Sequence, residues 1–274
     1  MNLPSKIGLI SGRGNFPLLI AQQIRKNFPG TLIYTAGFRK ETNNYVRKYS
    51  EEFRVFDFGA LGSAIDYFKS RGIEKSLIAG LISHKRLFDK NLRLDSVMQG
   101  ILDGAKDKKA DSILGGIASA MQSAGIELLS MLPVLEEHTA QEGILSQKQP
   151  GEAQKQDIEF GFSLAKELSR HDIGQTITVK DKCVVAVEAL EGTDACILRS
   201  GRMAGPGIAV IKVAKLHQDL RFDLPVIGPR TIKNMKKVKA AAIAIEAEKT
   251  CIVDKPEVIR LADKYGISIA VIKP

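Results

Sequence analysis

Over residues 6 to about 130, short apolar runs alternate with segments of helical periodicity, and this alternation constrains the fold more than any other feature. The apolar runs predict strands at residues 7–10, 31–35, 53–58, 76–81 and 126–130. The segments between them predict helices over 18–28 and 61–68, a polar helix running through Val46, and mainly helical, polar sequence over 84–124. Short buried strands joined by crossover helices form a parallel sheet. The first half therefore predicts a doubly wound, Rossmann-like α/β domain.

The composition changes in the middle of the chain. Residues 133–152 contain two prolines and two glycines and show no periodicity, which is typical of a connection between domains. We therefore predict domains over 1–132 and 153–274, joined by a linker over 133–152 that acts as a hinge. The second domain is predicted to be mixed α/β, with a hairpin formed by 176–179 and 183–189. Further strands are expected at 208–213, 240–246, 251–253 and 267–272, and helices at 152–170, 230–238 and 256–264.

The charge and the cysteines bound the environment of this 274-residue chain. Its net charge of +9 favours anionic partners, namely phosphates, nucleic acid or an acidic membrane surface, although an evenly solvated basic surface stays the alternative. The three cysteines show no C-x-x-C spacing, which indicates a reducing compartment. No run approaches the about 18 apolar residues of a spanning helix. These features predict a soluble, cytoplasmic protein whose membrane contact, if any, is peripheral.

The first glycine-rich loop follows the first predicted strand and reads Gly12-Arg13-Gly14-Asn15. Two glycines let the backbone approach a ligand, and the following helix offers free N–H groups. A dinucleotide site would also need a third glycine, where this chain has Pro17, and an acid near the end of the second strand, which ends without one at residues 34–37. An NAD enzyme is therefore disfavoured, and a phosphate or nucleotide-sugar site is favoured over a merely tight turn.

An acidic cluster follows the apolar strand that ends near residue 187. Glu188, Glu191 and Asp194 follow one another at three-residue spacing around Gly192. Acids this close repel one another unless a divalent metal such as Mg²⁺, or Lys and Arg partners, offsets their charge. If a helix begins near Gly192, simple capping by acids at its N-terminus also explains the pattern. Both readings stay open.

A second acidic turn contains Asp223, Pro225, Gly228 and Pro229. The prolines fix backbone angles, so an aspartate in this turn suits a general base or a metal ligand. An Asp223 that only braces the turn is an equally good explanation. Residues 228–231 form another candidate anion cradle at the start of a predicted helix. The chain contains no H-E-x-x-H or G-x-S-x-G motif, so zinc hydrolysis and acyl transfer lack their usual support.

Together these motifs resemble those of the LpxI family of UDP-2,3-diacylglucosamine pyrophosphatases, which act in lipid A biosynthesis. The resemblance covers nearly the whole chain and is most specific at the run from Ala186 to Ala195 and at the Asp-Leu-Pro turn beginning at Asp223. Its other anchors are the first glycine loop and residues 172–175. The chain departs from the family at residues 84–85 and 108–111, where only Asp111 of two usual acids remains.

The resemblance implies an enzyme that holds its substrate between two domains and cleaves the pyrophosphate to UMP and 2,3-diacylglucosamine 1-phosphate with Mg²⁺ or Mn²⁺. It implies that Asp223 is essential for turnover, with Asp194 and Glu191 as further catalytic candidates. A subset of Glu188, Glu191, Asp194 and Asp223 is expected to hold the metal. The candidates for substrate binding are Gly12, Gly14, Asn15, Gly80, Asp111, Thr193, Lys212 and Thr231.

The expected partners are the UDP-linked diacylated lipid and the cytoplasmic face of the inner membrane, and a homo-oligomer stays open. The alternatives are a nucleotide-sugar oxidoreductase and a non-catalytic nucleotide-sugar or lipid-binding protein. Nucleic acid is not an expected partner, because only 6% of residues are aromatic and none is Trp, whereas single-strand binding uses aromatic stacking.

Overall fold

The computed structural model describes residues 3–80, 92–107, 110–171, 173–216, 219, 221 and 224–273. The chain divides into two compact units, one formed by residues 1–135 with 219–222 and the other by 136–218 with 223–274. The division falls inside the segment predicted as a linker, which forms short 3₁₀ turns η2 (Leu132–Val134) and η3 (Glu136–His138) and strand β6 (Gly143–Ile144). The role of this segment as a hinge stays a prediction.

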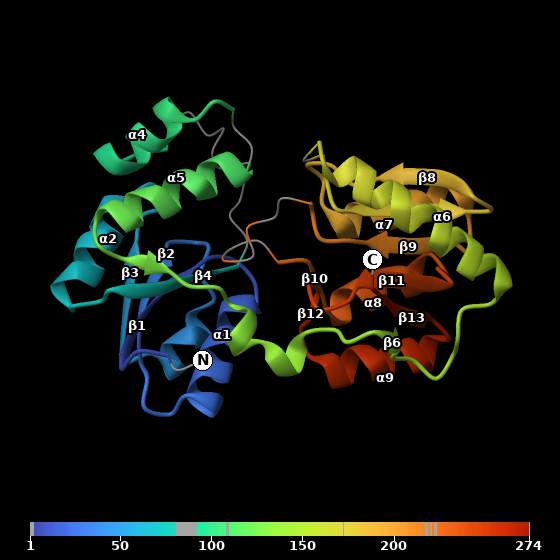
Figure 1. The fold of residues 1–274 in the computed structure, drawn as a ribbon, viewed down its shortest axis with the longest axis horizontal. Coiled ribbons are helices and arrows are strands. Elements are labelled where there is room, and N and C mark those ends of the chain that lie inside the picture. The colour runs from blue at the N-terminus through green and yellow to red at the C-terminus, as the bar shows by residue number, and fades with distance from the viewer. Residues whose placement is uncertain are drawn as a thin grey trace. The chain divides into compact units, whose positions relative to one another are not determined.

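Unit 1 is built on a five-stranded sheet in the order β3-β2-β1-β4-β5, with every neighbouring pair parallel (Figure 1). Its strands are β1 (Lys6–Ser11), β2 (Leu32–Phe38), β3 (Glu52–Phe56), β4 (Lys75–Ala79) and β5 (Glu127–Leu128). Its helices are α1 (Phe16–Asn27), η1 (Asn44–Tyr49), α2 (Leu61–Ser70), α4 (Ser96–Gly104) and α5 (Ala110–Ser123). The predicted Rossmann-like sheet is therefore confirmed.

Helices cover the sheet of unit 1 on both faces. Helices α2, α4 and α5 bury one apolar cluster against strand residues such as Ile10, Ala36 and Ile78. Helix α1 contributes nothing to that cluster and instead packs against η1 and β4. This arrangement follows from the apolar strands, which are buried on both faces and need helices on each.

Unit 2 contains a six-stranded sheet in the order β6-β13-β11-β9-β7-β8 and a separate parallel pair, β10-β12. Strands β9, β11 and β13 are parallel to one another, whereas β7 runs antiparallel to both β9 and β8. The strands are β7 (Thr176–Lys180), β8 (Cys183–Val187), β9 (Ala209–Lys212), β10 (Val226–Ile227), β11 (Ala242–Glu246), β12 (Cys251–Ile252) and β13 (Ser268–Ile272). The predicted mixed α/β domain is confirmed.

Two apolar clusters lie on opposite faces of this sheet. Helix α6 (Glu152–Ser169) covers one face, and Gly161 lets it approach closely, because a Cβ there would lie 2.8 Å from Ile211 Cδ1. The other face is covered by α7 (Thr193–Ala204), α8 (Pro229–Lys237) and α9 (Lys255–Tyr265). Successive residues along each strand belong to the two clusters in turn, as expected for a sheet that is buried on both faces.

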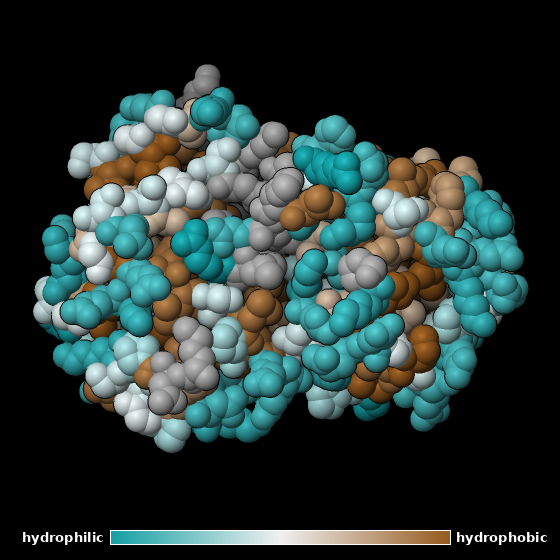
Figure 2. Space-filling view, viewed as in Figure 1, coloured by the Kyte–Doolittle hydropathy of each residue, from teal (hydrophilic) through white to brown (hydrophobic). Residues whose placement is uncertain are grey.

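The structure differs from the sequence predictions in a few elements. The polar helix predicted through Val46 is wrong, because β2 continues to Phe38 and only the 3₁₀ segment η1 follows it. Short strands β6 and β10 were not predicted, since two residues are too few to show a period. No helix within the described ranges is long and apolar enough to cross a membrane. Figure 2 shows hydrophilic residues over most of the visible face, interrupted by smaller hydrophobic patches.

Candidate functional site

The carboxyl ends of β1 and β4 form the first candidate site, in unit 1. These two strands are neighbours in the sheet, although β2 and β3 lie between them in the sequence, and the sheet order runs outward from them in both directions. The helix after β1 packs on one face of the sheet, and α2, α4 and α5 pack on the other. Ligands of open α/β sheets bind at such a reversal of strand order, outside the carboxyl ends of the strands.

The glycine loop lies at this reversal and contacts the end of β4. The Gly12 N–H donates to the Ala79 carbonyl at 2.8 Å. Gly80 has a φ of +96°, and a Cβ there would lie 2.8 Å from both Arg13 O and Pro17 Cγ. Gly14 also has a positive φ, of +87°, but a Cβ there would meet open space. Gly80 is thus required for close backbone approach, whereas Gly14 leaves the loop surface clear.

The first turn of α1 lacks a side-chain cap. Asn15 occupies the N-cap position, but its side-chain oxygen accepts a hydrogen bond from Asn43 Nδ2 at 2.9 Å and bonds no helix N–H. The first turn carries no acid. Uncapped N–H groups and the helix dipole together favour an anion at this end.

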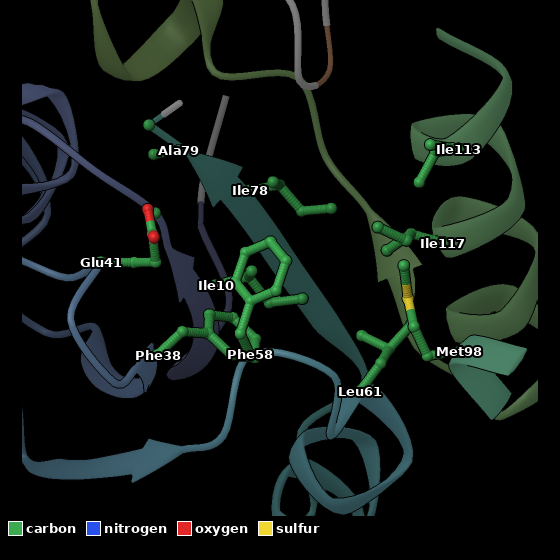
Figure 3. A pocket seen from close by; sticks show the side chains of 12 residues that line it. Ile10, Phe38, Glu41, Phe58, Leu61, Ile78, Ala79, Met98, Ile113 and Ile117 are labelled. Atoms are coloured by element: carbon green, nitrogen blue, oxygen red, sulfur yellow. The ribbon is translucent and has the colours of Figure 1, made fainter. Parts of the chain in front are cut away.

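A pocket opens beside the glycine loop and encloses about 640 Å³ of non-protein space, part of it continuous with solvent. Figure 3 shows Phe38, Phe58 and Glu41 facing it from one side and Met98, Ile113 and Ile117 from the other. Gly12 and Gly80 also line it. Sequence reasoning missed Glu41, which follows the end of β2 by three residues. An acid was expected only within residues 34–37, and Glu41 lies just beyond them.

The second candidate site lies in unit 2, at the sheet edge where β8 and β9 end and β7 begins. Thr176 and Lys212 are paired in register across β7 and β9, and Glu188 N donates to Thr176 O at 2.8 Å. The Thr193 hydroxyl donates to Glu188 Oε1 at 2.9 Å and accepts from Lys212 Nζ at 2.7 Å. Glu188 and Lys212 are 8% and 4% exposed. Of the predicted residues, Glu188, Thr193 and Lys212 therefore form one buried polar cluster.

Two glycines shape this edge. A Cβ on Gly174 would lie 2.1 Å from the Glu188 carbonyl oxygen, so only glycine permits this contact. Gly192, with a φ of +81°, precedes α7 and provides no side-chain cap. The buried Oε2 of Glu188 has no hydrogen-bond partner within the described chain. The cluster therefore presents an uncapped helix end, a buried ammonium and an unsatisfied carboxylate oxygen together.

The other two acids of the predicted metal group engage different partners. Glu191 accepts from Arg199 Nη2 at 2.5 Å, and Asp194 pairs with Arg230 Nε at 2.7 Å. Burial raises the pKa of Glu191, but hydrogen bonds from its own backbone and from Arg199 outweigh it and leave that pKa below its ordinary value. The described residues include no group of three or more metal-ligating side chains. Arginine partners therefore offset the charge of Glu191 and of Asp194 in the described structure.

The remaining predicted site residues lie elsewhere. Thr231 is buried in the first turn of α8, where its hydroxyl accepts from Gly228 N–H at 3.4 Å and so braces the turn. Asp111 belongs to α5 in unit 1, and its side chain lies outside the described part. Asp223 also lies outside the described residues. Its predicted role stays a prediction.

Sequence reasoning also missed Glu246, the last residue of β11, which is fully buried. Its carboxylate accepts from Lys166 Nζ at 3.1 Å, from Lys249 Nζ at 2.8 Å and from the Ala214 N–H at 2.8 Å. Burial raises the pKa of Glu246, but the hydrogen bonds from Lys249, Ala214 and Lys166 lower it by more. The pKa of Glu246 therefore lies below its ordinary value. Glu246 thus fixes the backbone two residues after Lys212. The feature of the sequence that could have revealed Glu246 is a single acid at the end of an apolar strand.

Comparisons with known proteins agree across the whole chain. Residues 6–138 match the LpxI N-terminal domain and residues 141–270 match the LpxI C-terminal domain. A relative from Caulobacter vibrioides, the UDP-2,3-diacylglucosamine pyrophosphatase LpxI, is 28% identical over 280 residues, which cover 98% of each protein. The two domain matches correspond to the two units, which carry the glycine loop and the Glu188–Lys212 cluster. The chain belongs to the LpxI family.

Proposed function

We propose that this chain hydrolyses the pyrophosphate of UDP-2,3-diacylglucosamine to UMP and 2,3-diacylglucosamine 1-phosphate, a step of lipid A biosynthesis. Family membership over both domains and the activity named for the Caulobacter relative support this. The observation that carries it in the structure is the Glu188–Thr193–Lys212 cluster. It places a buried cation beside an uncapped helix end, where an anionic ligand is stabilised.

The cluster supplies the electrostatics that pyrophosphate cleavage needs. The reaction moves negative charge onto the leaving phosphate, and a fixed ammonium in a water-poor site stabilises that charge without reorganising. Lys212 is held by the Thr193 hydroxyl and cannot swing freely, because its side chain is buried. The uncapped N–H groups of α7 add positive potential at the same edge. We propose that Lys212 and the α7 N-terminus hold the pyrophosphate.

The attacking water needs a base. We propose Asp223 for this role, with Asp194 or Glu191 as the next candidates. Asp194 is the better placed of these two, since its partner Arg230 is 84% exposed and the pair is open to solvent. Glu191 is held by Arg199 and by the Ala189 N–H, contacts that fix the loop before α7. Its lowered pKa makes it a weak base.

Dependence on Mg²⁺ or Mn²⁺ is a separate proposal that follows from the chemistry of the substrate. Mg²⁺ typically uses one or two carboxylates together with phosphate oxygens. The described residues include no group of three or more side chains that could hold the metal, and Asp223, the fourth candidate ligand, lies outside them. Chelation tests this directly: we expect hydrolysis to stop in excess EDTA and to return with Mg²⁺, and undiminished hydrolysis in EDTA would contradict the proposal.

The function itself is tested by incubating the purified chain with UDP-2,3-diacylglucosamine and Mg²⁺ and separating the products. We expect equal amounts of UMP and 2,3-diacylglucosamine 1-phosphate, and no hydrolysis of UDP-glucose as a lipid-free comparison. Release of UDP in place of UMP would mean that a different bond is cleaved. Absence of any product with Mg²⁺ and Mn²⁺ would exclude the activity.

We further propose that the chain acts at the cytoplasmic face of the inner membrane. The net charge of +9 favours anionic lipid headgroups, and Leu190, in the loop before α7, is 86% exposed. A single exposed leucine beside a site for a two-tailed lipid fits insertion among acyl chains. Sedimentation with anionic vesicles tests this: Leu190→Ser should weaken binding, whereas Met203→Ser, which removes another exposed apolar side chain, should not.

A further inference from the structure

The end of β9, the strand that carries Lys212, is held by an ion pair in place of a neighbouring strand. The ladder between β9 and β11 ends at Lys212. Two positions later, the Ala214 N–H donates to Glu246 Oε2 and the Ala214 carbonyl accepts from Lys166 Nζ, both at 2.8 Å. Ala214 is only 1% exposed. Both backbone groups of a buried residue are thus satisfied by side chains, which replace the next bonds of the ladder.

The two side chains that hold Ala214 also hold each other. Lys166 Nζ lies 3.1 Å from Glu246 Oε2, and the two side chains are 18% and 0% exposed. Lys166 extends from α6 and Glu246 ends β11, so the pair joins a helix to the sheet at the edge where Lys212 lies. Hydrogen bonds to ionised groups are stronger than neutral ones, and more so away from water. The pair therefore fixes the Ala214 backbone firmly.

We propose that Lys166, together with Glu246, is a positioning residue that anchors the end of β9 and so holds Lys212 in place. The inference rests on the proposed function, because it names what holds the lysine that the proposed reaction uses. The ends of regular elements open most easily, and Lys212 is the last residue of its strand. The anchor two residues later protects Lys212 from fraying of that end. Displacement of a reacting group by about 1 Å can cost about 10²-fold in rate.

The anchor acts on Lys212 through the backbone of β9. Helix α6 covers one face of the sheet, and the anchoring pair lies on that face. The Lys212 side chain points to the other face, where its Nζ donates to the Thr193 hydroxyl of α7 at 2.7 Å. Any effect of Lys166 on Lys212 therefore passes through residues 212–214. This separates a positioning role from direct contact with substrate.

Lys249 provides a matched control for a purely stabilising role. Its Nζ lies 2.8 Å from Glu246 Oε1, so it pairs with the same carboxylate as Lys166 does. Among the described contacts Lys249 bonds the carboxylate alone, whereas Lys166 also bonds the Ala214 carbonyl. If the cluster only adds stability, removal of either lysine has similar effects. If it positions Lys212, only the removal of Lys166 changes that side chain.

The anchor is tested without an assay of hydrolysis by the rate at which acetic anhydride acylates Lys212 in the full-length protein, followed by mass spectrometry. Lys212 is 4% exposed, and we expect it to react at least about tenfold more slowly than the exposed Lys182. A hydrogen bond to a charged group corresponds to about a tenfold or greater change in an equilibrium. Lys166→Met should therefore speed acylation of Lys212 by about that factor, whereas Lys249→Met should leave it unchanged. Lys166→Arg, which keeps a charged donor, should restore protection.

Turnover gives the second readout. Lys166→Met should lower kcat for UMP release from UDP-2,3-diacylglucosamine by about tenfold or more, whereas Lys249→Met should stay within about twofold of the wild type. Because the anchor acts through Lys212, adding Lys166→Met to Lys212→Met should lower kcat by less than about twofold further. An effect of Lys166 that is independent of Lys212 predicts the full loss in that background as well.

The outcomes separate the anchor from the proposed function. The inference is overturned if wild-type Lys212 reacts as fast as Lys182, if folded Lys166→Met leaves its acylation unchanged, or if Lys249→Met speeds it equally. Faster acylation with unchanged kcat, or a full loss of kcat in the Lys212→Met background, also overturns it. Acylation that depends on Lys166 in a protein that releases no UMP supports the anchor while the proposed activity fails. If Lys166→Met does not fold, Lys166→Gln, whose shorter side chain carries no charge, is measured in its place and read in the same way.

Discussion

Replacing Gly80 by alanine tests how closely the glycine loop and β4 approach each other. Gly80 has a φ of +96°, and an added Cβ would lie 2.8 Å from Arg13 O and Pro17 Cγ. Ordinary carbon contacts lie near about 3.5–4.0 Å, so the loop would have to move by about 0.7 Å or more. Gly72 is the matched control, because its φ is also positive, at +66°, but a Cβ there meets nothing within 4 Å.

The two variants separate backbone strain from steric overlap. A side chain at positive φ costs about 1–2 kcal/mol, and overpacking adds about 1–3 kcal/mol. We therefore expect Gly72→Ala to lower the free energy of unfolding by about 1–2 kcal/mol and Gly80→Ala by about 2–5 kcal/mol, as measured by urea denaturation. Gly80→Ala should also weaken UMP binding, because the loop is displaced, whereas Gly72→Ala should not. Equal destabilisation by both substitutions, with unchanged UMP affinity, would refute this reasoning.

Three further substitutions test unit 2. Thr193→Val removes two hydrogen bonds to charged groups, worth about 1.5–3 kcal/mol each. Urea denaturation should show that the free energy of unfolding falls by about 3 kcal/mol or more, and the rate of UMP release should fall at least about tenfold. Thr193→Ser should restore both stability and turnover. Glu246→Gln disrupts a buried ion pair and should destabilise by about 3–5 kcal/mol at pH 7. The pKa of Glu246 is lowered from its ordinary 4.5, so the stabilisation by its carboxylate is present above pH 4.5 and lost as the pH falls below it. The unfolding free energies of wild type and variant should therefore converge toward acid. A difference in unfolding free energy that stays constant down to about pH 3 would contradict this. Asp223→Ala should lower kcat by about 10²–10⁴-fold with an intact melt and retained substrate binding, and less than a tenfold loss in a folded variant would move the catalytic role to Asp194.

Periodicity predicted most of the fold, because each buried strand is a short apolar run flanked by turn residues. Strand β1 and helix α1 could be read directly from residues 7–28. The segment after β2 could not, since residues 44–49 form a 3₁₀ helix whose single buried side chain, Val46, leaves no amphipathic pattern. The same error hid Glu41, because an acid was expected only up to residue 37, whereas β2 continues to Phe38.

The candidate site was only partly predictable for a different reason. The residues after β8 stood out because three acids follow an apolar strand, and the predicted Glu188, Thr193 and Lys212 do meet. Their partners could not be found from spacing. Arg230 lies 36 positions after Asp194 and Lys166 lies 80 positions before Glu246, and only the packing of the helices on the sheet brings these pairs together. Long-range ion pairs have no local signature in a single sequence.

Turnover of Lys212→Met tests most directly whether the cluster of Glu188, Thr193 and Lys212 carries pyrophosphate hydrolysis. The matched control is Lys182→Met, an exposed lysine in the turn between β7 and β8, at the opposite edge of the same sheet. With UDP-2,3-diacylglucosamine as substrate and UMP release as the readout, normalised to folded protein, we expect Lys212→Met to lose about 10²-fold or more and Lys182→Met to match the wild type. Turnover by folded Lys212→Met within threefold of the wild type would contradict the account.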